Sequence, residues 1–503
     1  MIENLLLGFS AFANPLVWAA LVFGALVGYL IGAIPGLGPS LGVALLIPFT
    51  YGVDPVVSIV GLVALYAAAE YGGAITAVLI NSPGTAAAVA TAWDGYPLSQ
   101  QGRAADALTV SIISSGIGIL VSTTFLIVTA VPLSELALRF GPGEYFGLAL
   151  VGLSLVAGLS DTSPLKGMVA MGIGLAMATV GLDAQIGVPR FTGGHYELFE
   201  GLPLVPVLLG LYALSEVLFM IEDGAAAKVK SIATASGIAS IPFRAMKGLR
   251  TVVVRSSILG YIIGVIPGAG ASIASFVSYA VSKRFSKTPE KFGNGSLEGV
   301  ASSEAANNAA VAGALAPLLA LGIPGSATTA VMIGALMVQG VQPGPLLFAR
   351  TPEIPYTVFA SLFVGVPIMV FIGLAGSKVW AQVANIPRPA IAAIVGGICF
   401  VGAYASETTM FPVQVMTFFG ILGYVLRKLG VPLAPIILAL VLGELMETNF
   451  RRALISNQGE WDIFYTSPLT VLLLLIAVLA FALPGLAALQ ARRRRRIAAK
   501  SAA

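Results

Sequence analysis

Long runs without charged residues dominate this sequence. Residues 4–53 contain no Asp, Glu, Lys or Arg, and the same holds for residues 107–134, 256–282, 305–349 and 354–377. A helix that crosses a membrane needs about 20 mostly apolar residues. With the shorter apolar segments between these runs, the pattern predicts an all-α polytopic membrane protein with roughly 11–12 transmembrane helices plus broken or re-entrant segments.

A twelve-residue apolar motif occurs twice within these runs. The copies cover residues 29–40 and 261–272, and eight of their twelve positions are identical. Both contain Pro-Gly-x-Gly in a stretch that would otherwise continue as helix. Proline removes a backbone donor and glycine tolerates unwound conformations, so each copy predicts a break in a helix. The residues concerned are Pro35, Gly36, Gly38 and Ser40 in the first copy and Pro267, Gly268, Gly270 and Ser272 in the second.

A second break follows the motif in each half of the chain. The helix predicted over 55–80 ends at Asn81-Ser82-Pro83-Gly84-Thr85, and a later apolar run reaches Gly322-Ile323-Pro324-Gly325-Ser326. A polar connection is predicted at Trp93–Pro97, after the first of these breaks. Within lipid, unwound backbone is stable only where protein shields it or where it lines a polar cavity. Matched pairs of breaks in the two halves therefore predict a transport site between them.

The arms on either side of the second motif copy are too short to cross a membrane. Residues 256–266 and 271–282 make arms of 11 and 12 residues. At about 1.5 Å per residue, each reaches only ~17 Å against a hydrocarbon core of ~30 Å. The arms form either a hairpin that enters and returns or one broken helix that crosses. Basic residues on both flanks favour the hairpin, because loops rich in Lys and Arg stay in the cytoplasm.

Composition argues against a soluble protein. Charged residues make up 10% of the chain, against about 25% in soluble domains. The net charge of +4 is modest and the basic residues cluster in loops, which favours membrane topology signals over nucleic-acid binding. We predict a first membrane half over 1–222, a basic cytoplasmic linker over 223–255, a second membrane half with C-terminal spans over 256–490, and a basic cytoplasmic tail over 491–503.

The breaks carry groups that suit an anion. A helix that starts just after Pro-Gly presents free N–H groups and the positive end of its dipole. Unwound carbonyl groups at the same breaks can coordinate Na⁺. Alternatively, the small residues serve only close helix packing. The candidate substrate- and ion-binding residues are Pro35, Gly36, Gly38, Ser40, Asn81, Ser82, Gly84, Thr85, Gly268, Gly270, Ser272, Asn307, Asn308, Gly325, Ser326, Thr328 and Thr329.

Two carboxylates are candidates for ion coupling. Glu70 and Glu304 occupy similar places in the two halves, inside or at the mouth of apolar runs. A carboxylate at membrane depth is costly and usually functional. The alternative is that each lies at a helix end among lipid headgroups. Asn307 and Asn308 would be costly facing lipid, so we expect them to face a cavity or a neighbouring helix.

Few residues could support catalysis. The chain has one cysteine, Cys399, and one histidine, His195, which argues against a zinc or iron–sulfur centre, and we expect no cofactor. It lacks a Walker sequence, so a gradient of Na⁺ or H⁺ is the expected energy source. An intramembrane enzyme is disfavoured because no Ser/His/Asp set is evident. An ion channel is the alternative function, since broken helices also build selectivity filters.

Together the motifs resemble those of the large membrane subunit of tripartite tricarboxylate transporters, the TctA family. The resemblance implies a fold of two inverted repeats. It also implies import of citrate-like tricarboxylates or related organic acid anions across a bacterial inner membrane, driven by Na⁺ or H⁺. It also implies two partners, a small four-helix membrane subunit and a periplasmic solute-binding protein. The strings that carry it are 29–40, Asn81–Thr85, Trp93–Pro97 with Gly102 and Arg103, 261–272, Glu304–Asn308 and Gly322–Ser326.

Overall fold

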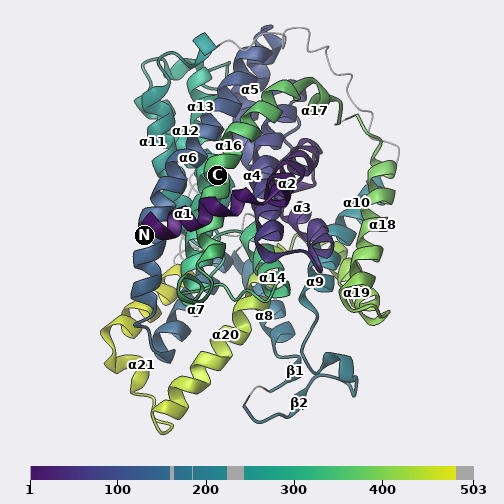
Figure 1. Cartoon of the computed structure of the whole chain (residues 1–503), viewed down its shortest axis with the longest axis vertical. Helices are drawn as coiled ribbons and strands as arrows, with labels where there is room; N and C mark the ends of the chain where they lie inside the picture. The colour runs from purple at the N-terminus through teal and green to yellow at the C-terminus, as the bar shows by residue number, and fades with distance from the viewer. Residues whose placement is uncertain (1, 159–163, 184, 224–242, 384, 483–503) are drawn as a thin grey trace, which may run out of the picture. The chain divides into compact units, whose positions relative to one another are not determined.

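The computed structural model describes residues 2–158, 164–183, 185–223, 243–383 and 385–482. Helices account for nearly all the regular structure of these residues (Figure 1). The described strands, β1 (Gly181–Leu182) and β2 (Pro189–Arg190), form one short antiparallel pair. The predicted all-α polytopic fold is confirmed.

Packing divides the chain into two compact units. Unit 1 comprises Met1–Ala137 and Leu204–Tyr424, and unit 2 comprises Leu138–Pro203 and Val425–Ala503. All four predicted breaks belong to unit 1. The repeat boundaries stay a prediction, because the units follow packing rather than the internal repeat.

The first half of unit 1 follows the predicted helices closely. The predicted helix over 55–80 is α4 (Pro55–Ile80), whose start is fixed by the Asp54 carboxylate. That carboxylate accepts hydrogen bonds from the N–H groups of Val56 at 2.9 Å and Val57 at 3.3 Å, as expected of a helix N-cap. The other helices here are α1 (Ile2–Ser10), α2 (Pro15–Ala33), α3 (Gly38–Leu46), α5 (Val89–Gln100) and α6 (Ala104–Ala137).

The second half of unit 1 contains more and shorter helices. A π-helical turn, Leu209–Leu214, joins α9 (Leu204–Leu208) to α10 (Ser215–Asp223). The remaining helices are α11 (Arg250–Val265), α12 (Gly270–Phe285), α13 (Leu297–Leu321), α14 (Ala327–Val338), α15 (Leu347–Arg350), α16 (Glu353–Ala375), α17 (Ser377–Val383), α18 (Arg388–Glu407) and α19 (Phe411–Lys428), the last of which runs on into unit 2.

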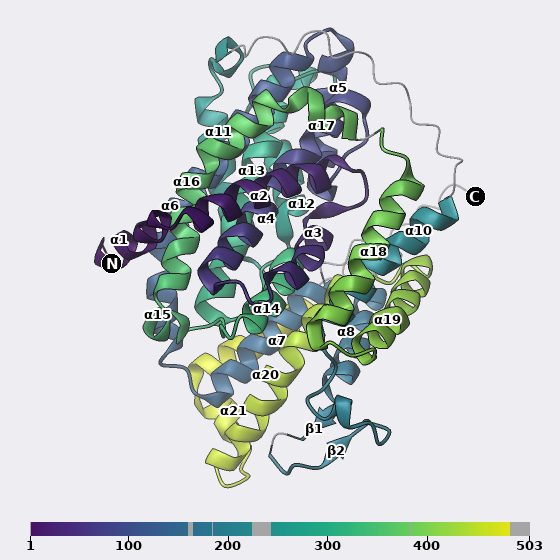
Figure 2. The same cartoon turned by 45° about the vertical axis from the view of Figure 1, so that its right-hand side comes forward.

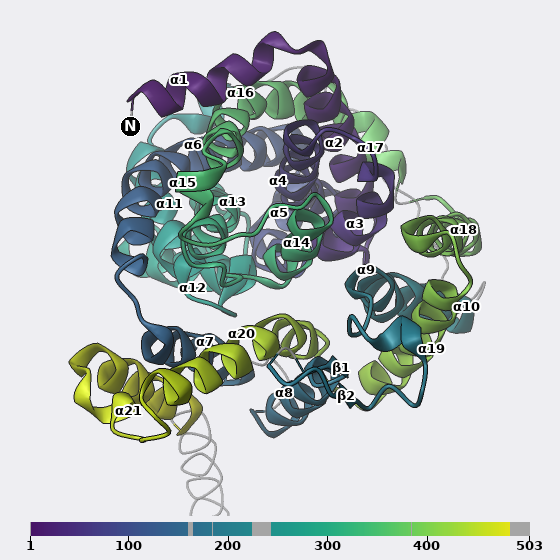
Figure 3. The same ribbon diagram turned by 60° about the horizontal axis from the view of Figure 1, so that its bottom comes forward.

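Helices α4 and α13 form the buried centre of unit 1, enclosed by α2, α6, α11, α12 and α16 (Figure 3). Glycine lets α2 and α11 approach them closely. A Cβ at Gly32 would lie 2.1 Å from the Ala69 carbonyl oxygen of α4, and one at Gly260 would lie 2.3 Å from the Ala306 carbonyl oxygen of α13. Small residues allow helices to pack this tightly in lipid, so close packing is one role of the motif regions.

Unit 2 is built around α20 (Ala434–Ser456), which packs against α7 (Pro142–Gly158) and α8 (Pro164–Ala178) (Figure 2). It also contains the β1–β2 pair, α21 (Ile463–Thr466) and an apolar helix over Pro468–Ala482.

The structure differs from one sequence prediction and leaves others open. The segment Trp93–Pro97, predicted as a polar connection, lies inside helix α5. Among the described residues, six helices are long and apolar enough to cross a membrane, and five more are apolar but shorter, so the number of crossings stays a prediction. Most of the linker, 224–242, and the whole tail, 491–503, lie outside the described residues.

Candidate functional site

Both motif copies break a helix in the same way. The residue after α2 and the residue after α11 are extended. Gly36 and Gly268 then adopt φ angles of 97° and 81°, in the left-handed region that favours glycine. Gly38 and Gly270, with φ angles of 54° and 60°, start α3 and α12. The predicted breaks are present, and a helix starts directly after each one.

The break in the second motif copy, at Pro267 and Gly268, reverses the direction of the chain. Arg255, near the start of α11, donates from Nη2 to Ser282 Oγ, near the end of α12, at 3.0 Å. Its guanidinium also lies 5.2 Å from the centre of the Phe285 ring. The far ends of the two arms therefore lie together, and α11 and α12 run side by side (Figure 1). The chain reversal expected of the hairpin is therefore present, and one helix continuing in a single direction is excluded. Entry of the hairpin into the membrane and its return stay a prediction.

The second break of each half packs against the first break of the same half. A Cβ at Gly84 would lie 1.8 Å from the Gly32 carbonyl oxygen, and one at Gly325 would lie 2.9 Å from that of Gly264. The N–H of Gly268 also donates to the Gly325 carbonyl oxygen at 3.2 Å. Only glycine fits at such close approaches, which explains why both breaks contain Pro-Gly.

Hydroxyl groups then join the two halves. Ser40 Oγ and Thr328 Oγ1 lie 2.9 Å apart, and Tyr66 OH lies 3.2 Å from Ser326 Oγ. Ser326 caps α14 through a reciprocal pair of hydrogen bonds with Thr329. Among the described residues, no hydrogen bond joins the two motif copies directly. The link runs from the first motif copy to the second break of the other half.

Several predicted residues remain accessible beside these contacts. Gly36 and Asn81 are exposed, and Ser40, Ser82 and Ser272 are half-buried. Ser272 lies at the start of α12 and is not part of the Ser40–Thr328 contact. The accessible surface of the breaks contrasts with the buried helices around them, so a solute could reach the helix starts.

A buried carboxylate lies deeper in the same unit. Glu304 is fully buried in the second turn of α13. Its Oε1 accepts from the Thr91 hydroxyl, and its Oε2 accepts from Ser115 Oγ at 2.9 Å. Asn308 Nδ2 donates to the same Ser115 oxygen at 2.7 Å. Each carboxylate oxygen of Glu304 thus accepts a hydrogen bond, but the ion pairs among the described residues do not include Glu304.

Glu70 is buried nearby and lies within electrostatic range of Glu304. Thr85 lies beside its carboxylate, yet neither Glu70 Oε2 nor Thr85 Oγ1 has a partner with hydrogen-bond geometry. The amide of Asn307 and the Oδ1 of Asn308 are likewise buried without partners. Buried polar atoms are almost always satisfied by protein groups or by water, so these atoms are candidates for contact with bound water or an ion.

The sequence suggested similar positions for Glu70 and Glu304 in the two halves, but in the structure their positions are not equivalent. The matching contacts of Gly84 and Gly325 align the halves. Glu70 precedes Gly84 by 14 residues, whereas Glu304 precedes Gly325 by 21, a difference of about two helical turns. Both lie well inside helices, so a position at a helix end among headgroups is wrong.

The carboxylate cluster can hold a monovalent cation or a proton. Two buried carboxylates without a cationic side chain are stable only when something neutralises them. Among the described residues, no group of three His, Cys, Asp or Glu side chains could hold a metal ion. A cation here would be held by carboxylate, hydroxyl and amide oxygens, which are ligands for hard cations.

With this geometry in hand, a comparison with protein families is informative. The model of the tripartite tricarboxylate transporter TctA family matches residues 18–438, which include all four breaks and both carboxylates. The chain belongs to the TctA family. This is a transporter family, and the structure gives this member a membrane-type helical fold.

Two relatives of this TctA-family chain come from Agrobacterium vitis. An uncharacterized 52.8 kDa protein in the TAR-I ttuC' 3' region is 36% identical over 497 residues, which cover 98% of each chain. An uncharacterized protein in the TAR-II ttuC' 3' region is 38% identical over 230 residues, covering 45% of this chain and 95% of its own length. No solved structure matches this chain.

One residue of this TctA-family chain was missed by the sequence reasoning. Asp94 of α5 is fully buried. Its Oδ1 accepts from the N–H groups of Gly293, Gly295 and Ser296 at 2.8–3.0 Å, and its Oδ2 accepts from Tyr279 OH at 2.9 Å. Asp94 therefore fastens the first half to the loop before α13, which carries Glu304. The only sequence signal was an acidic residue within a string typical of the family.

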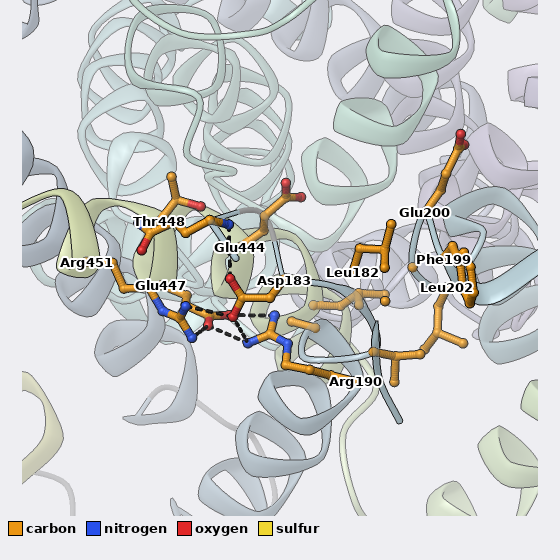
Figure 4. A pocket seen from close by; sticks show the side chains of 16 residues that line it. Leu182, Asp183, Arg190, Phe199, Glu200, Leu202, Glu444, Glu447, Thr448 and Arg451 are labelled. Atoms are coloured by element: carbon orange, nitrogen blue, oxygen red, sulfur yellow. Dashed lines mark hydrogen bonds and ion pairs between the residues drawn. The ribbon is translucent and has the colours of Figure 1, made fainter. Parts of the chain in front are cut away.

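Unit 2 contains a separate polar pocket of about 250 Å³ (Figure 4). Arg190 contacts Glu447 at 2.6 Å and Asp183 at 3.4 Å, and Arg451 contacts both acids at 2.7 Å. Hydrogen bonds from the backbone N–H groups of Gln185 and Ile186, together with Arg451, hold the pKa of Asp183 below its usual range. Both arginines are already paired with carboxylates, so this pocket is poorly suited to an anionic substrate.

Proposed function

We propose that this chain is the large permease subunit of a tripartite, cation-coupled secondary transporter that imports tricarboxylates or related organic acid anions. The observation that carries the proposal is the meeting of the two halves at their breaks. Ser40, two residues into α3, touches Thr328, in the first turn of α14, at 2.9 Å. Two helix starts, one from each half, converge on one point.

Converging helix starts suit an anion that must be released again. Each start contributes free N–H groups and the positive end of a helix dipole. The hydroxyl groups of Ser40, Ser326 and Thr328 add donors at the same place. The motif copies contain no Lys or Arg. A carboxylate held by dipoles and hydroxyl groups, without a fixed ion pair, binds moderately and can leave on the other side.

The carboxylate cluster supports coupling to Na⁺ or H⁺. Glu304 and Glu70 interact electrostatically and have no cationic partner among the described residues. The unsatisfied oxygens of Thr85 and Asn308 lie in the same buried region of unit 1. A cation or proton that enters would neutralise the carboxylates and satisfy these oxygens. The free energy of cation binding would thereby couple cation entry to α4, the helix that carries Glu70 and ends before Asn81.

The loop between β1 and α9 supports the proposed docking of a periplasmic solute-binding protein. In the sequence, the candidate span Leu204–Glu222 lies between this loop and the basic linker, and the positive-inside rule therefore favours the periplasmic side for the loop. Its side chains of Ile186, Phe191 and Tyr196 are 68%, 78% and 75% exposed. Large exposed apolar groups on a polar loop are typical of protein interfaces.

Reconstitution tests the proposal. The full chain is placed in proteoliposomes with its small membrane subunit and its solute-binding protein, and uptake of labelled citrate and other organic acids is measured under an imposed Na⁺ or H⁺ gradient. We expect saturable, gradient-dependent uptake that requires the solute-binding protein. Absence of gradient-dependent uptake for every carboxylate tested would refute the proposal. Large single-channel currents in planar bilayers would instead support a pore.

A further inference from the structure

The base of the α11–α12 hairpin carries a hollow that no transport role explains. It has a volume of about 580 Å³ and is lined by Arg250, Thr251, Val254, Arg255, Ile258 and Leu259 of α11. Arginines line one end of the hollow and aliphatic side chains the other. We propose that it is a binding site for an anionic phospholipid on the cytoplasmic leaflet. This inference does not depend on the transport function.

The charge of the surrounding chain favours an anionic ligand. Between Asp223 and Glu290 the sequence contains nine basic residues and no acidic one. Among the described residues, Arg250 and Arg255 form no ion pair. The unbalanced positive charge identifies this end of the hairpin as cytoplasmic and attracts the negatively charged leaflet.

Arg255 is held ready for a headgroup. Its Nη2 donates to Ser282 Oγ at 3.0 Å, and its guanidinium lies over the Phe285 ring. These contacts fix the side chain beside Arg250. Thr251 lies one turn earlier on the same helix face and adds a hydroxyl. A phosphate group bound here would meet a guanidinium that is already held in position.

The apolar part of the hollow favours a lipid over a free phosphate. Val254, Ile258 and Ile262 are spaced four residues apart along α11, and Ile266 directly follows the helix; these side chains are 40%, 36%, 54% and 39% exposed. They form a continuous aliphatic stripe that starts beside the arginines and runs toward the break at Pro267. An acyl chain that extends from a headgroup at Arg250 and Arg255 would cover this stripe, whereas inorganic phosphate would leave it bare.

Native mass spectrometry of the detergent-solubilised full chain tests the proposal. Dioleoylphosphatidylglycerol, dioleoylphosphatidylcholine and inorganic phosphate are titrated in turn. We expect retention of phosphatidylglycerol, at least tenfold weaker retention of phosphatidylcholine, and no retention of phosphate. Equal binding of the two lipids would overturn the proposal, and so would binding of phosphate as tight as that of phosphatidylglycerol.

Variants locate the site. Arg250→Gln/Arg255→Gln should weaken phosphatidylglycerol binding about 30-fold, the factor for two arginine contacts of ordinary strength. Lys283→Gln/Lys287→Gln removes the same charge from α12 and its following loop but leaves the hollow intact, so it should change binding less than about twofold. Arg250→Gln alone, an exposed change on a helix surface, keeps the test valid if the double variant does not fold. Equal losses in the two double variants would show a diffuse charge effect and refute the site.

Discussion

The segments Asn81–Thr85 and Gly322–Ser326 share a backbone design but differ in how their polar groups are used. Each ends a buried helix in a left-handed residue and places Pro-Gly against the first break of its half. At the second segment, Ser326 caps α14 and Gly325 accepts a backbone hydrogen bond. At the first, Thr85 makes no side-chain cap, and its buried hydroxyl lies beside the Glu70 carboxylate without hydrogen-bond geometry.

This difference distinguishes a segment that stabilises the backbone from a segment that contributes to ligand binding. A satisfied polar group fixes a backbone, and its removal is felt as lost stability. An unsatisfied buried group costs stability unless water or a ligand satisfies it. We therefore propose that the second segment supports the site and that the first segment contributes to binding.

The largest expected effect tests whether the motif breaks work as a pair. Gly36→Leu and Gly268→Leu should each abolish uptake while the protein still inserts. The added side chain at a positive φ angle costs about 1–2 kcal/mol, which a folded membrane protein tolerates, but it fills the accessible break. Uptake and membrane insertion are measured together. Gly52→Leu, also at positive φ but with open space around it, is the matched control and should transport normally. Normal uptake by either motif variant would mean that its break serves packing alone.

The second prediction compares the two buried carboxylates. Glu304→Gln should reduce gradient-driven uptake to below about a tenth, since typical coupling energies correspond to factors of 5–150. Glu70→Gln should do the same, because both carboxylates share the neutralising cation. Substrate exchange without a gradient should survive in both variants. Glu444→Gln, an exposed change in unit 2, is the control. Gradient-driven uptake at the wild-type rate in both glutamine variants would remove the coupling role.

The third prediction divides the two break segments directly. Ser326→Ala loses a helix cap and should lower the free energy of unfolding by about 1 kcal/mol. Thr85→Val deletes an unpartnered hydroxyl at similar volume, so stability should be unchanged or higher, while cation dependence of uptake weakens. Thermal unfolding and the cation concentration for half-maximal uptake are recorded for both. The reverse pattern would show that the first segment is the support.

The smallest expected effect concerns Asp183, a hydrogen-bonded carboxylate in unit 2. The pKa of Asp183 is lowered by backbone hydrogen bonds from Gln185 and Ile186 and by Arg451. A lowered pKa in the folded state means that this stabilisation is complete above the unfolded pKa of about 4 and is lost as the pH falls through the folded value. Asp183→Asn should therefore increase proteolysis of the 181–203 segment at pH 7, with the difference from wild type shrinking in acid below about pH 4. A difference independent of pH would contradict the assignment.

The sequence predicted what local chemistry determines. The Pro-Gly-x-Gly string combines a missing backbone donor with two residues that tolerate positive φ angles, so the breaks after Ala33 and Val265 were predictable. Flanking basic residues indicated the hairpin. The sequence did not reveal contacts set by packing across the chain. Gly95 and Pro97 suggested a connection where tertiary contacts of Asp94 stabilise a helix. The two-turn offset between Glu70 and Glu304 became visible only when the Gly84 and Gly325 contacts aligned the halves.

The bonds of Asp94 also constrain how the protein is made. Its partners in the 293–296 loop are synthesised about 200 residues later, so a ribosome has long since released α5 when they emerge. Until then the carboxylate oxygens of Asp94 lack their hydrogen-bond donors, although this side chain will be buried in the folded protein. We therefore expect that neither half reaches its folded state without the other. If the gene were cut within the 224–242 segment, the two fragments should survive in a cell only when both are expressed.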